Sequence, residues 1–419
     1  MDYDRLINDR GIYLYKDDSF NTISICLSWL ASNSDRDNAI YDLMTDYIMN
    51  SNKLYTSRDV INNVAKYLYG INVYVDLVSM GKQREFEFNI DMISPTVVGD
   101  NYANDAFMYA KALLELPAFN DQELFEKYKR VRLSNIRSNL SSSVKRARDL
   151  YFENVIPCDG EHYLHSIDLK EIEDLYNSIT LKDLKRLYKK TINDKNFHNG
   201  LVFGNITDEE FKLFRQWFPN ESTMGKLEYT RNRPIKEGTI IIPNDSTDQS
   251  IVYQTFSLDR ADRGITDLLA DIFMGSSDLC LKILREKYGL VYESFFQIYY
   301  FDNFMYIKSK IDKKDLDKLI EATDEMLSIV QDEKTLKPYL DRAKEATKMD
   351  GYLLSEDRDS LIRELESKIN DAYDGYDYNK FTEEVDKVKE EDVTKLTKSF
   401  KRRNVFMYRG DAKWESIRK

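Results

Sequence analysis

A twelve-residue segment occurs twice in this chain, and the repeat limits strongly what the chain can fold into. Residues 40–51 (IYDLMTDYIMNS) and 265–276 (ITDLLADIFMGS) share an isoleucine, both aspartates, a leucine, a methionine and a serine. All six coincide at one offset, 225 (265 − 40). A 419-residue chain that repeats itself at about half its length is predicted to contain two copies of one domain.

Other matches follow in the same order along both halves. The apolar residues of each repeated segment recur at helical spacing, and two runs rich in β-branched residues precede each segment. A Tyr-Gly pair and a predicted hairpin follow it in both halves, and each half closes on a predicted strand with glycine near its end, at 201–205 and 405–411. Five matches in one order indicate a tandem duplication.

The predicted fold class is α+β, with two tandem homologous domains, each a mostly antiparallel sheet covered by helices. The first domain is predicted to span residues 1–218 and the second residues 239–419. The irregular stretch 219–238 is predicted to link them.

The composition limits which binding partners and which cellular compartment are expected. A net charge of −12 argues against nucleic acid as a partner, because a phosphate backbone requires a basic surface. The N-terminus has no apolar core of signal-peptide length and no segment has 18 uninterrupted apolar residues, so we expect no membrane partner and a cytoplasmic location. The cysteines Cys26, Cys158 and Cys280 lack metal-ligand spacing and are expected to be buried thiols.

Residues 285–292 (REKYGLVY) resemble the Arg-Glu-x-x-Gly-Leu-x-Tyr signature of the pitrilysin–insulinase–processing-peptidase family. The Gly-Ser-Ser sequence that is expected before this signature stands at 275–277. Residues 161–163 (EHY) resemble a His-Pro-Tyr stretch of that family without its proline. The resemblance covers nearly the whole chain. It implies the family's duplicated fold and a peptide as substrate.

Active members of that family carry a His-x-x-Glu-His motif, in which two imidazoles on one helix face bind Zn²⁺ and the glutamate activates water. Alignment of this chain to the family places the motif on Asp42, Thr45 and Asp46. The family's third ligand, a later glutamate, falls near Tyr128. The resemblance therefore implies a degenerate zinc motif and a chain without a zinc cofactor of its own.

Two other arrangements of candidate metal ligands are open. Asp42 and Asp46 form an i, i+4 carboxylate pair, but the second copy repeats the pair at Asp267 and Asp271, which favours a solvated or salt-bridged helix face. His162 and His165 have His-x-x-His spacing, but the proline and glycine that flank them suggest a loop and an incidental role.

Arg285 and Tyr292 are the remaining candidates for chemistry. Arg285 is expected in the last turn of a helix that Gly289 ends, and Tyr292 at the start of the next strand. In the resembled family an arginine and a tyrosine at this spacing hold the substrate carbonyl while the tetrahedral intermediate forms. The alternative is structural, because the chain has 29 tyrosines and an arginine near a helix C-terminus also suits the helix dipole.

A chain that lacks the zinc ligands but retains this pair resembles the non-catalytic subunit of two-chain bacterial members of the family. The first hypothesis is a heterodimer in which a zinc-bearing paralogue, or a second copy in a homodimer, receives Arg285 and Tyr292 at its peptide-cleaving site. The second is a catalytically empty peptide-binding or scaffold protein, similar to proteins associated with 5-aminopentanol modification of elongation factor P. An independent enzyme that uses His162 and His165 is the third.

Overall fold

The computed structural model describes residues 3–156, 168–230, 232–260, 262–275, 278–354, 356–370 and 381–411. These residues divide into two compact units. The first unit lies within 1–137, 160–228 and 358–372, and the second within 138–159, 229–357 and 373–419. The predicted division at 219–238 follows the sequence repeat, whereas each compact unit also takes a segment from the other half of the chain.

The first unit is built on a six-stranded sheet with the order β1-β2-β6-β3-β5-β4. Only the β2–β6 pair of this sheet is parallel. Its strands are β1 (Ile7–Asp9), β2 (Ile12–Lys16), β3 (Thr22–Leu30), β4 (Asn72–Met80), β5 (Gln83–Ile93) and β6 (Phe197–Gly204).

The second unit has a five-stranded sheet with the order β7-β11-β8-β10-β9, in which only the β7–β11 pair is parallel. Its strands are β7 (Gly238–Asn244), β8 (Gln249–Ser257), β9 (Ser294–Tyr299), β10 (Phe304–Asp312) and β11 (Lys401–Gly410). Without β1 the two sheets have the same strand order, so the predicted α+β fold with two homologous, mostly antiparallel sheets is confirmed.

Helices fill the sequence between the strands. In the first half they are α1 (Asp35–Ile48), α2 (Arg58–Tyr67), α3 (Pro95–Val98), α4 (Ala103–Glu115), α5 (Gln122–Ser141), α6 (Ser143–Val155), α7 (Leu169–Ser178), α8 (Leu181–Thr191) and α9 (Asp208–Trp217). In the second half they are α10 (Arg263–Met274), the π-helix η2 (Leu281–Lys287), α11 (Leu316–Gln331), α12 (Glu333–Leu354), α13 (Arg358–Ile369), α14 (Phe381–Lys387) and α15 (Glu390–Lys398).

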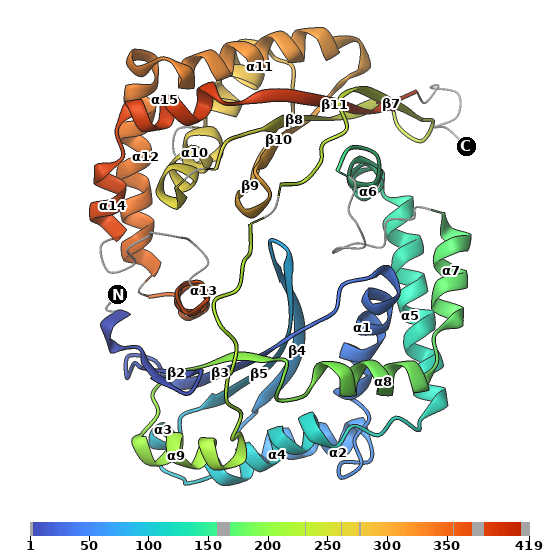
Figure 1. Cartoon of the computed structure of the whole chain (residues 1–419). Coiled ribbons are helices and arrows are strands. Elements are labelled where there is room, and N and C mark those ends of the chain that lie inside the picture. Colours follow the sequence, from blue (N-terminus) through green and yellow to red (C-terminus); the bar gives the residue numbers. More distant parts are fainter. Residues whose placement is uncertain are drawn as a thin grey trace. The chain divides into compact units, whose positions relative to one another are not determined.

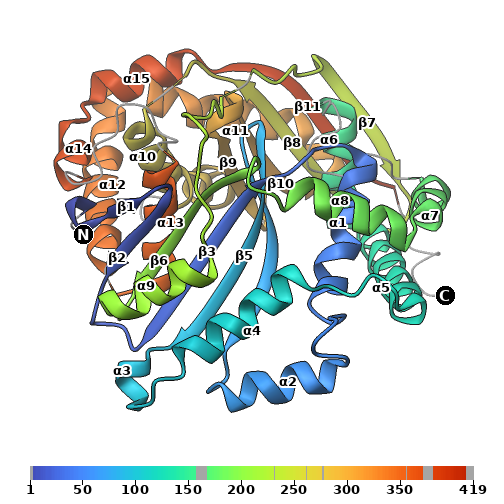
Figure 2. The same cartoon turned by 60° about the horizontal axis from the view of Figure 1, so that its bottom comes forward.

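Alternation along β5 explains why the first sheet has one apolar and one polar face. Phe86, Phe88 and Ile90 are fully buried on one face, while Glu87 and Asn89 point to the other. The apolar face receives α1, whose Tyr41 ring lies 6.4 Å from that of Phe86, and the neighbouring helices α4 and α9 (Figure 2). The repeated segments are thus the amphipathic helices α1 and α10, as their spacing predicts.

Each half of the chain contributes one helix to the other half's sheet (Figure 1). From the first half, α6 packs on β8 and β11, where the Tyr151 ring stacks on Tyr253 at 4.3 Å. From the second half, α13 packs on β6 of the first sheet, and Asn199 Nδ2 donates to Asn370 Oδ1 at 2.6 Å. The two exchanged helices occupy corresponding places in the repeat, so the exchange is reciprocal.

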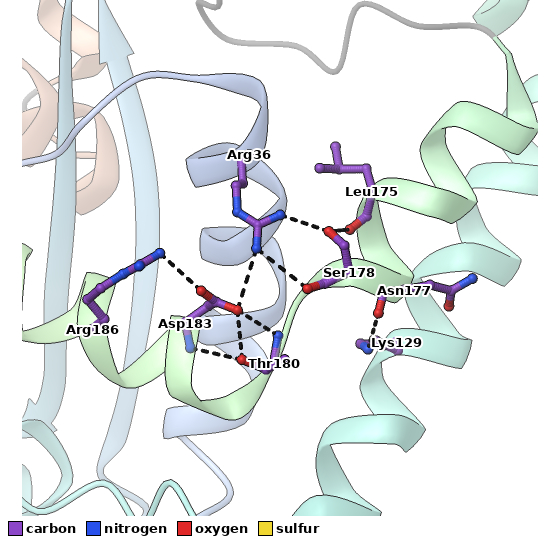
Figure 3. Close-up of polar contacts among 8 residues, drawn as sticks. All are labelled: Arg36, Lys129, Leu175, Asn177, Ser178, Thr180, Asp183 and Arg186. Atoms are coloured by element: carbon purple, nitrogen blue, oxygen red, sulfur yellow. Dashed lines mark hydrogen bonds and ion pairs between the residues drawn. The ribbon is translucent and has the colours of Figure 1, made fainter.

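A polar cluster fixes the corner between α7 and α8 against α1 (Figure 3). Thr180 and Asp183 form a capping box at the start of α8, and Arg186 donates to Asp183 at 3.0 Å. Arg36, from the first turn of α1, donates to Ser178 Oγ at 2.7 Å and pairs with Asp183 at 3.5 Å. The cluster thereby holds α7 beside the helix that carries the degenerate motif.

Candidate functional site

The family resemblance places the degenerate zinc motif on Asp42, Thr45 and Asp46, which lie in the middle of α1. The polar groups of these residues contact other parts of the protein. The Tyr176 hydroxyl, on α7, donates to Asp42 Oδ2 at 2.9 Å. Burial raises the pKa of Tyr176, and the Asp42 carboxylate adds to that rise, so the phenol stays protonated as the donor. The Thr45 hydroxyl donates back to the Asp42 carbonyl at 3.3 Å, which suits a helical threonine and leaves no general base at this position.

Helix α5 brings a cation to this face of α1. Arg132 Nη2 lies 3.1 Å from Asp46 Oδ2, and Arg132 Nε donates to the Asp42 carbonyl at 3.1 Å. Tyr128 stands one turn earlier on α5; burial raises its pKa, and the charge of Asp46 contributes to the shift. Near the position expected for a third metal ligand, α5 therefore presents a phenol and a guanidinium.

A second guanidinium approaches α1 from the sheet. Arg84, on β5, is only 9% exposed and lies 5.7 Å from the Tyr41 ring centre. Burial lowers its pKa, and the attraction of Asp42 opposes that shift. With Arg132 and Arg84 nearby, the two aspartates are balanced by protein cations, which compete with any metal ion at this position.

Sequence reasoning did not single out Arg132, Arg84 or Tyr176. The available signal for Arg132 was its i, i+4 spacing from Tyr128, which places both residues on one face of α5. The second copy of the segment also has a salt bridge, since Arg263 Nε lies 3.4 Å from Asp267 Oδ2 on α10.

Arg285 lies on η2, a seven-residue π-helix at the surface of the second unit. The Tyr288 N–H donates to the Ile283 carbonyl at 3.2 Å, and the turn ends at Gly289, whose φ of 64° favours glycine. The expected helix end is therefore observed. π-Helical turns are rare and are frequent at functional sites.

Tyr292 lies in the connection between η2 and β9, two residues before the strand begins, and not at the strand start as expected. Its side chain is 76% exposed, because a residue outside the β9–β10 ladder is not held against the sheet. Within the described ranges, the side chains of Arg285 and Tyr292 take part in no hydrogen bond or ion pair.

Their neighbours behave differently. Lys287 Nζ and the Tyr288 hydroxyl both bind Glu325, at 2.5 Å and 2.6 Å. Arg285 and Tyr292 thus differ from the adjacent cation and phenol in having donors free to meet another molecule, within the part of the chain that the structure describes.

Only one of the three histidines, His198, lies in the part of the chain that the structure describes. His198 is buried and its Nδ1 lies 3.1 Å from Glu85 Oε1, on the polar face of the first sheet. His162, His165 and the EHY stretch lie outside the described residues, as do Ser276, Ser277 and Cys158. Cys26 and Cys280 are buried free thiols, as expected.

The strand order and the duplicated, helix-covered sheets are similar to those of solved structures that include M16-like proteins. A conserved protein from Enterococcus faecalis V583 superposes with a TM-score of 0.83 at 14% identity, covering 98% of this chain and 99% of its own. A peptidase M16 inactive domain from Pseudomonas fluorescens gives 0.74 at 14% identity, covering 96% and 97%. A protease from Helicobacter pylori gives 0.73 at 13% identity, covering 96% and 98%.

Residues 178–347 match the family described as peptidase M16 inactive domain. This match and the structural similarities confirm the expected resemblance to M16-like inactive peptidase proteins. No curated protein matches the sequence. Within the described ranges, no helix is both long and apolar enough to cross a membrane.

Proposed function

We propose that this chain is the non-catalytic subunit of a two-chain zinc peptidase. A partner bears the zinc, and this chain donates Arg285 and Tyr292 to the partner's peptide-cleaving site. The observation that carries the proposal is the exposure of these two side chains, without partners among the described residues, beside Lys287 and Tyr288, which are both engaged.

The chemistry of the pair suits this role. A guanidinium and a phenol both donate hydrogen bonds, and a substrate carbonyl oxygen accepts them more strongly as it becomes negative in the transition state. Removal of one such donor in oxyanion-type sites costs about 10²–10³ in kcat. A guanidinium has five N–H donors and no acceptor, so Arg285 can only donate to that oxygen.

Zinc must come from the partner because α1 offers Asp42, Thr45 and Asp46 in place of the motif, next to Arg132. A zinc-motif-bearing paralogue supplies the missing ligands, whereas a homodimer repeats the same degenerate helix. We therefore favour the paralogue as partner and expect the complex to be cytoplasmic, with a bacterial origin.

The substrate is a peptide, and β4 offers a place to bind it. Among the described residues this strand is the last of its sheet and pairs on one side only, with β5. Tyr74 and Val78 project from it and are 37% and 40% exposed. An extended peptide can add to such an edge through main-chain hydrogen bonds and place its side chains against these two residues.

Reconstitution tests the proposal. The chain is mixed with a paralogue that carries an intact zinc motif, and the mixture is analysed by size-exclusion chromatography and by cleavage of a peptide library. We expect a complex whose peptidase activity exceeds that of either chain alone and is lost on chelation. Failure to form a complex, or activity of the paralogue that this chain does not change, contradicts the proposal.

The open edge of β4 also favours a second candidate, a peptide-binding scaffold without catalysis. An accessory role in a process such as elongation factor P modification is one form of it. Peptide binding by the isolated chain, together with no change in the activity of any zinc-bearing paralogue, would favour this second function.

A further inference from the structure

A cluster of metal-ligating side chains lies on the polar face of the first sheet, away from α1. Cys26 on β3, Glu87 on β5 and Glu366 on α13 place their ligand atoms within 4.8 Å of one another. Alternation along β3 and β5 points Cys26 and Glu87 to the face opposite Phe86, and therefore opposite α1. The cluster is thus separate from the degenerate zinc motif.

The three groups line a cavity of about 530 Å³ between the sheet and α13. Other polar groups of this cavity include Tyr74, Asp76, Asp91 and Arg358. Asp91 is already engaged, since it accepts from Ser24 at 2.7 Å and lies 3.4 Å from Arg358. The cavity gives an ion a route to the cluster and room for a water molecule beside it.

Two partly buried carboxyl groups and a buried thiol in one place are costly to ionise together. Burial raises the pKa of Glu87, and the nearby carboxylates of Glu366, Glu85 and Asp76 raise it further. Burial likewise raises the pKa of Glu366 and, together with the two carboxylates, that of Cys26. Protonation relieves the repulsion among these groups, and a bound divalent cation would relieve it as well.

We propose that Cys26, Glu87 and Glu366 form a binding site for a divalent transition metal of the zinc class. One sulfur and two carboxylate oxygens suit Zn²⁺ or Co²⁺ better than Ca²⁺ or Mg²⁺, which prefer oxygen ligands alone. Neighbouring ligands on a tetrahedral zinc lie about 3.4–3.7 Å apart, so small side-chain rotations from separations within 4.8 Å complete the site.

Binding of the metal ion releases protons from its ligands. The metal forms one bond to Cys26 Sγ and one to each glutamate, and the protons of the thiol and of the protonated carboxyls pass to solvent. Arg363 on α13 lies near enough to Glu366 to favour its charged form. Three protein ligands leave the fourth position open toward the cavity, and the bound metal joins α13, from the second half of the chain, to the sheet of the first half.

The test is a Co²⁺ titration of the full-length chain after removal of metals with a chelator. We expect one Co²⁺ per chain, with a thiolate-to-cobalt charge-transfer absorption that Zn²⁺ displaces. Cys26→Ser abolishes this absorption, and Glu87→Gln and Glu366→Gln each weaken Co²⁺ binding by about tenfold or more. The matched controls Cys280→Ser, at the other buried thiol, and Glu364→Gln, on the same helix, leave the absorption unchanged.

Circular dichroism of each metal-free variant verifies its fold, and the two glutamine variants decide the question if Cys26→Ser does not fold. A wild-type chain without the charge-transfer absorption overturns the proposal. So does an absorption that disappears with Cys280 or Cys158 and persists in Cys26→Ser, or Co²⁺ affinities that both glutamine variants leave unchanged.

Discussion

Arg132 Nη2 on α5 lies 3.1 Å from Asp46 Oδ2 on α1, so an arginine faces the helix on which the family resemblance places the degenerate zinc motif. The same guanidinium donates to the Asp42 carbonyl. A positively charged side chain therefore occupies the surroundings of Asp42 and Asp46. This relationship supports the proposal that the zinc comes from a partner and not from α1.

Restoring the motif alone is predicted not to restore a tight zinc site. We expect the variant Asp42→His, Thr45→Glu, Asp46→His to bind Zn²⁺ weakly on α1, because Arg132 repels the metal and Tyr128 stands at the position expected for the third ligand. Adding Tyr128→Glu and Arg132→Ala is expected to raise the affinity about tenfold or more. Calorimetric Zn²⁺ titration in a Cys26→Ser background measures both, and equal affinities would contradict the account.

The exchanged helix α6 predicts an effect across the two halves of the sequence. Tyr151 is fully buried, and its hydroxyl lies 2.9 Å from Thr255 Oγ1 on β8. Tyr151→Phe should destabilise the protein by about 1 kcal/mol through loss of this hydrogen bond, and Tyr151→Ala by about 3–5 kcal/mol through the cavity it leaves.

Urea unfolding followed by amide hydrogen exchange checks this prediction. In Tyr151→Ala, the amides of β8 and β11 should lose protection before those of β3 and β5. The exposed Tyr67 is 82% accessible, so Tyr67→Ala is the matched control and should change stability by less than about 0.5 kcal/mol. Uniform loss of protection in both sheets would contradict separate stabilisation of the second sheet by α6.

The capping box of α8 predicts a dependence of stability on acid pH. Burial pushes the pKa of Asp183 upward, but hydrogen bonds from Thr180 and the charges of Arg36 and Arg186 outweigh it, and the net pKa is lowered from 3.8. The stabilisation is therefore complete above the unfolded-state value of 3.8 and is lost as pH falls through the lower folded-state pKa.

Asp183→Asn should accordingly lower the unfolding free energy at neutral pH and reduce its fall below pH 3.8. Thr180→Ala removes the cap itself and should cost about 1 kcal/mol. Thermal unfolding of the two variants and the wild type across the acid range measures the effect. Parallel pH profiles for Asp183→Asn and the wild type would refute the assignment.

Particular residues show which parts of this molecule the sequence could predict. The repeated segments predicted α1 and α10, because apolar residues at helical spacing are sufficient to define a buried helix face. The sequence could not predict which sheet α6 and α13 pack on. An apolar helix face, such as the one that contains Tyr151, predicts burial but does not identify the sheet that buries it. Cys26 was expected to be buried, but its neighbours are far away in sequence. Glu87 meets it through the pairing of β3 with β5, and Glu366 through the exchange of α13.

In the candidate site, too, the sequence predicted the features that depend on local signals but not those that depend on contacts between distant segments. Gly289 fixed the end of the helix that carries Arg285, because a local stop signal requires no tertiary information. Tyr292 precedes β9 instead of beginning it, since hairpin ends depend on the partner strand. Arg132 and Tyr176 belong to other helices, and only the fold shows that they contact α1.

The most direct test of the central claim is the kcat/KM of the reconstituted two-chain peptidase with Arg285→Ala and Tyr292→Phe. We predict a decrease of about 10²–10³ for Arg285→Ala, expressed in kcat, with complex formation unchanged. Tyr292→Phe should also lower kcat. The neighbours Lys287→Ala and Tyr288→Phe serve as controls and should retain wild-type kcat/KM. Activity unaffected by Arg285→Ala and Tyr292→Phe in an intact complex would contradict donation of this pair to the partner's site.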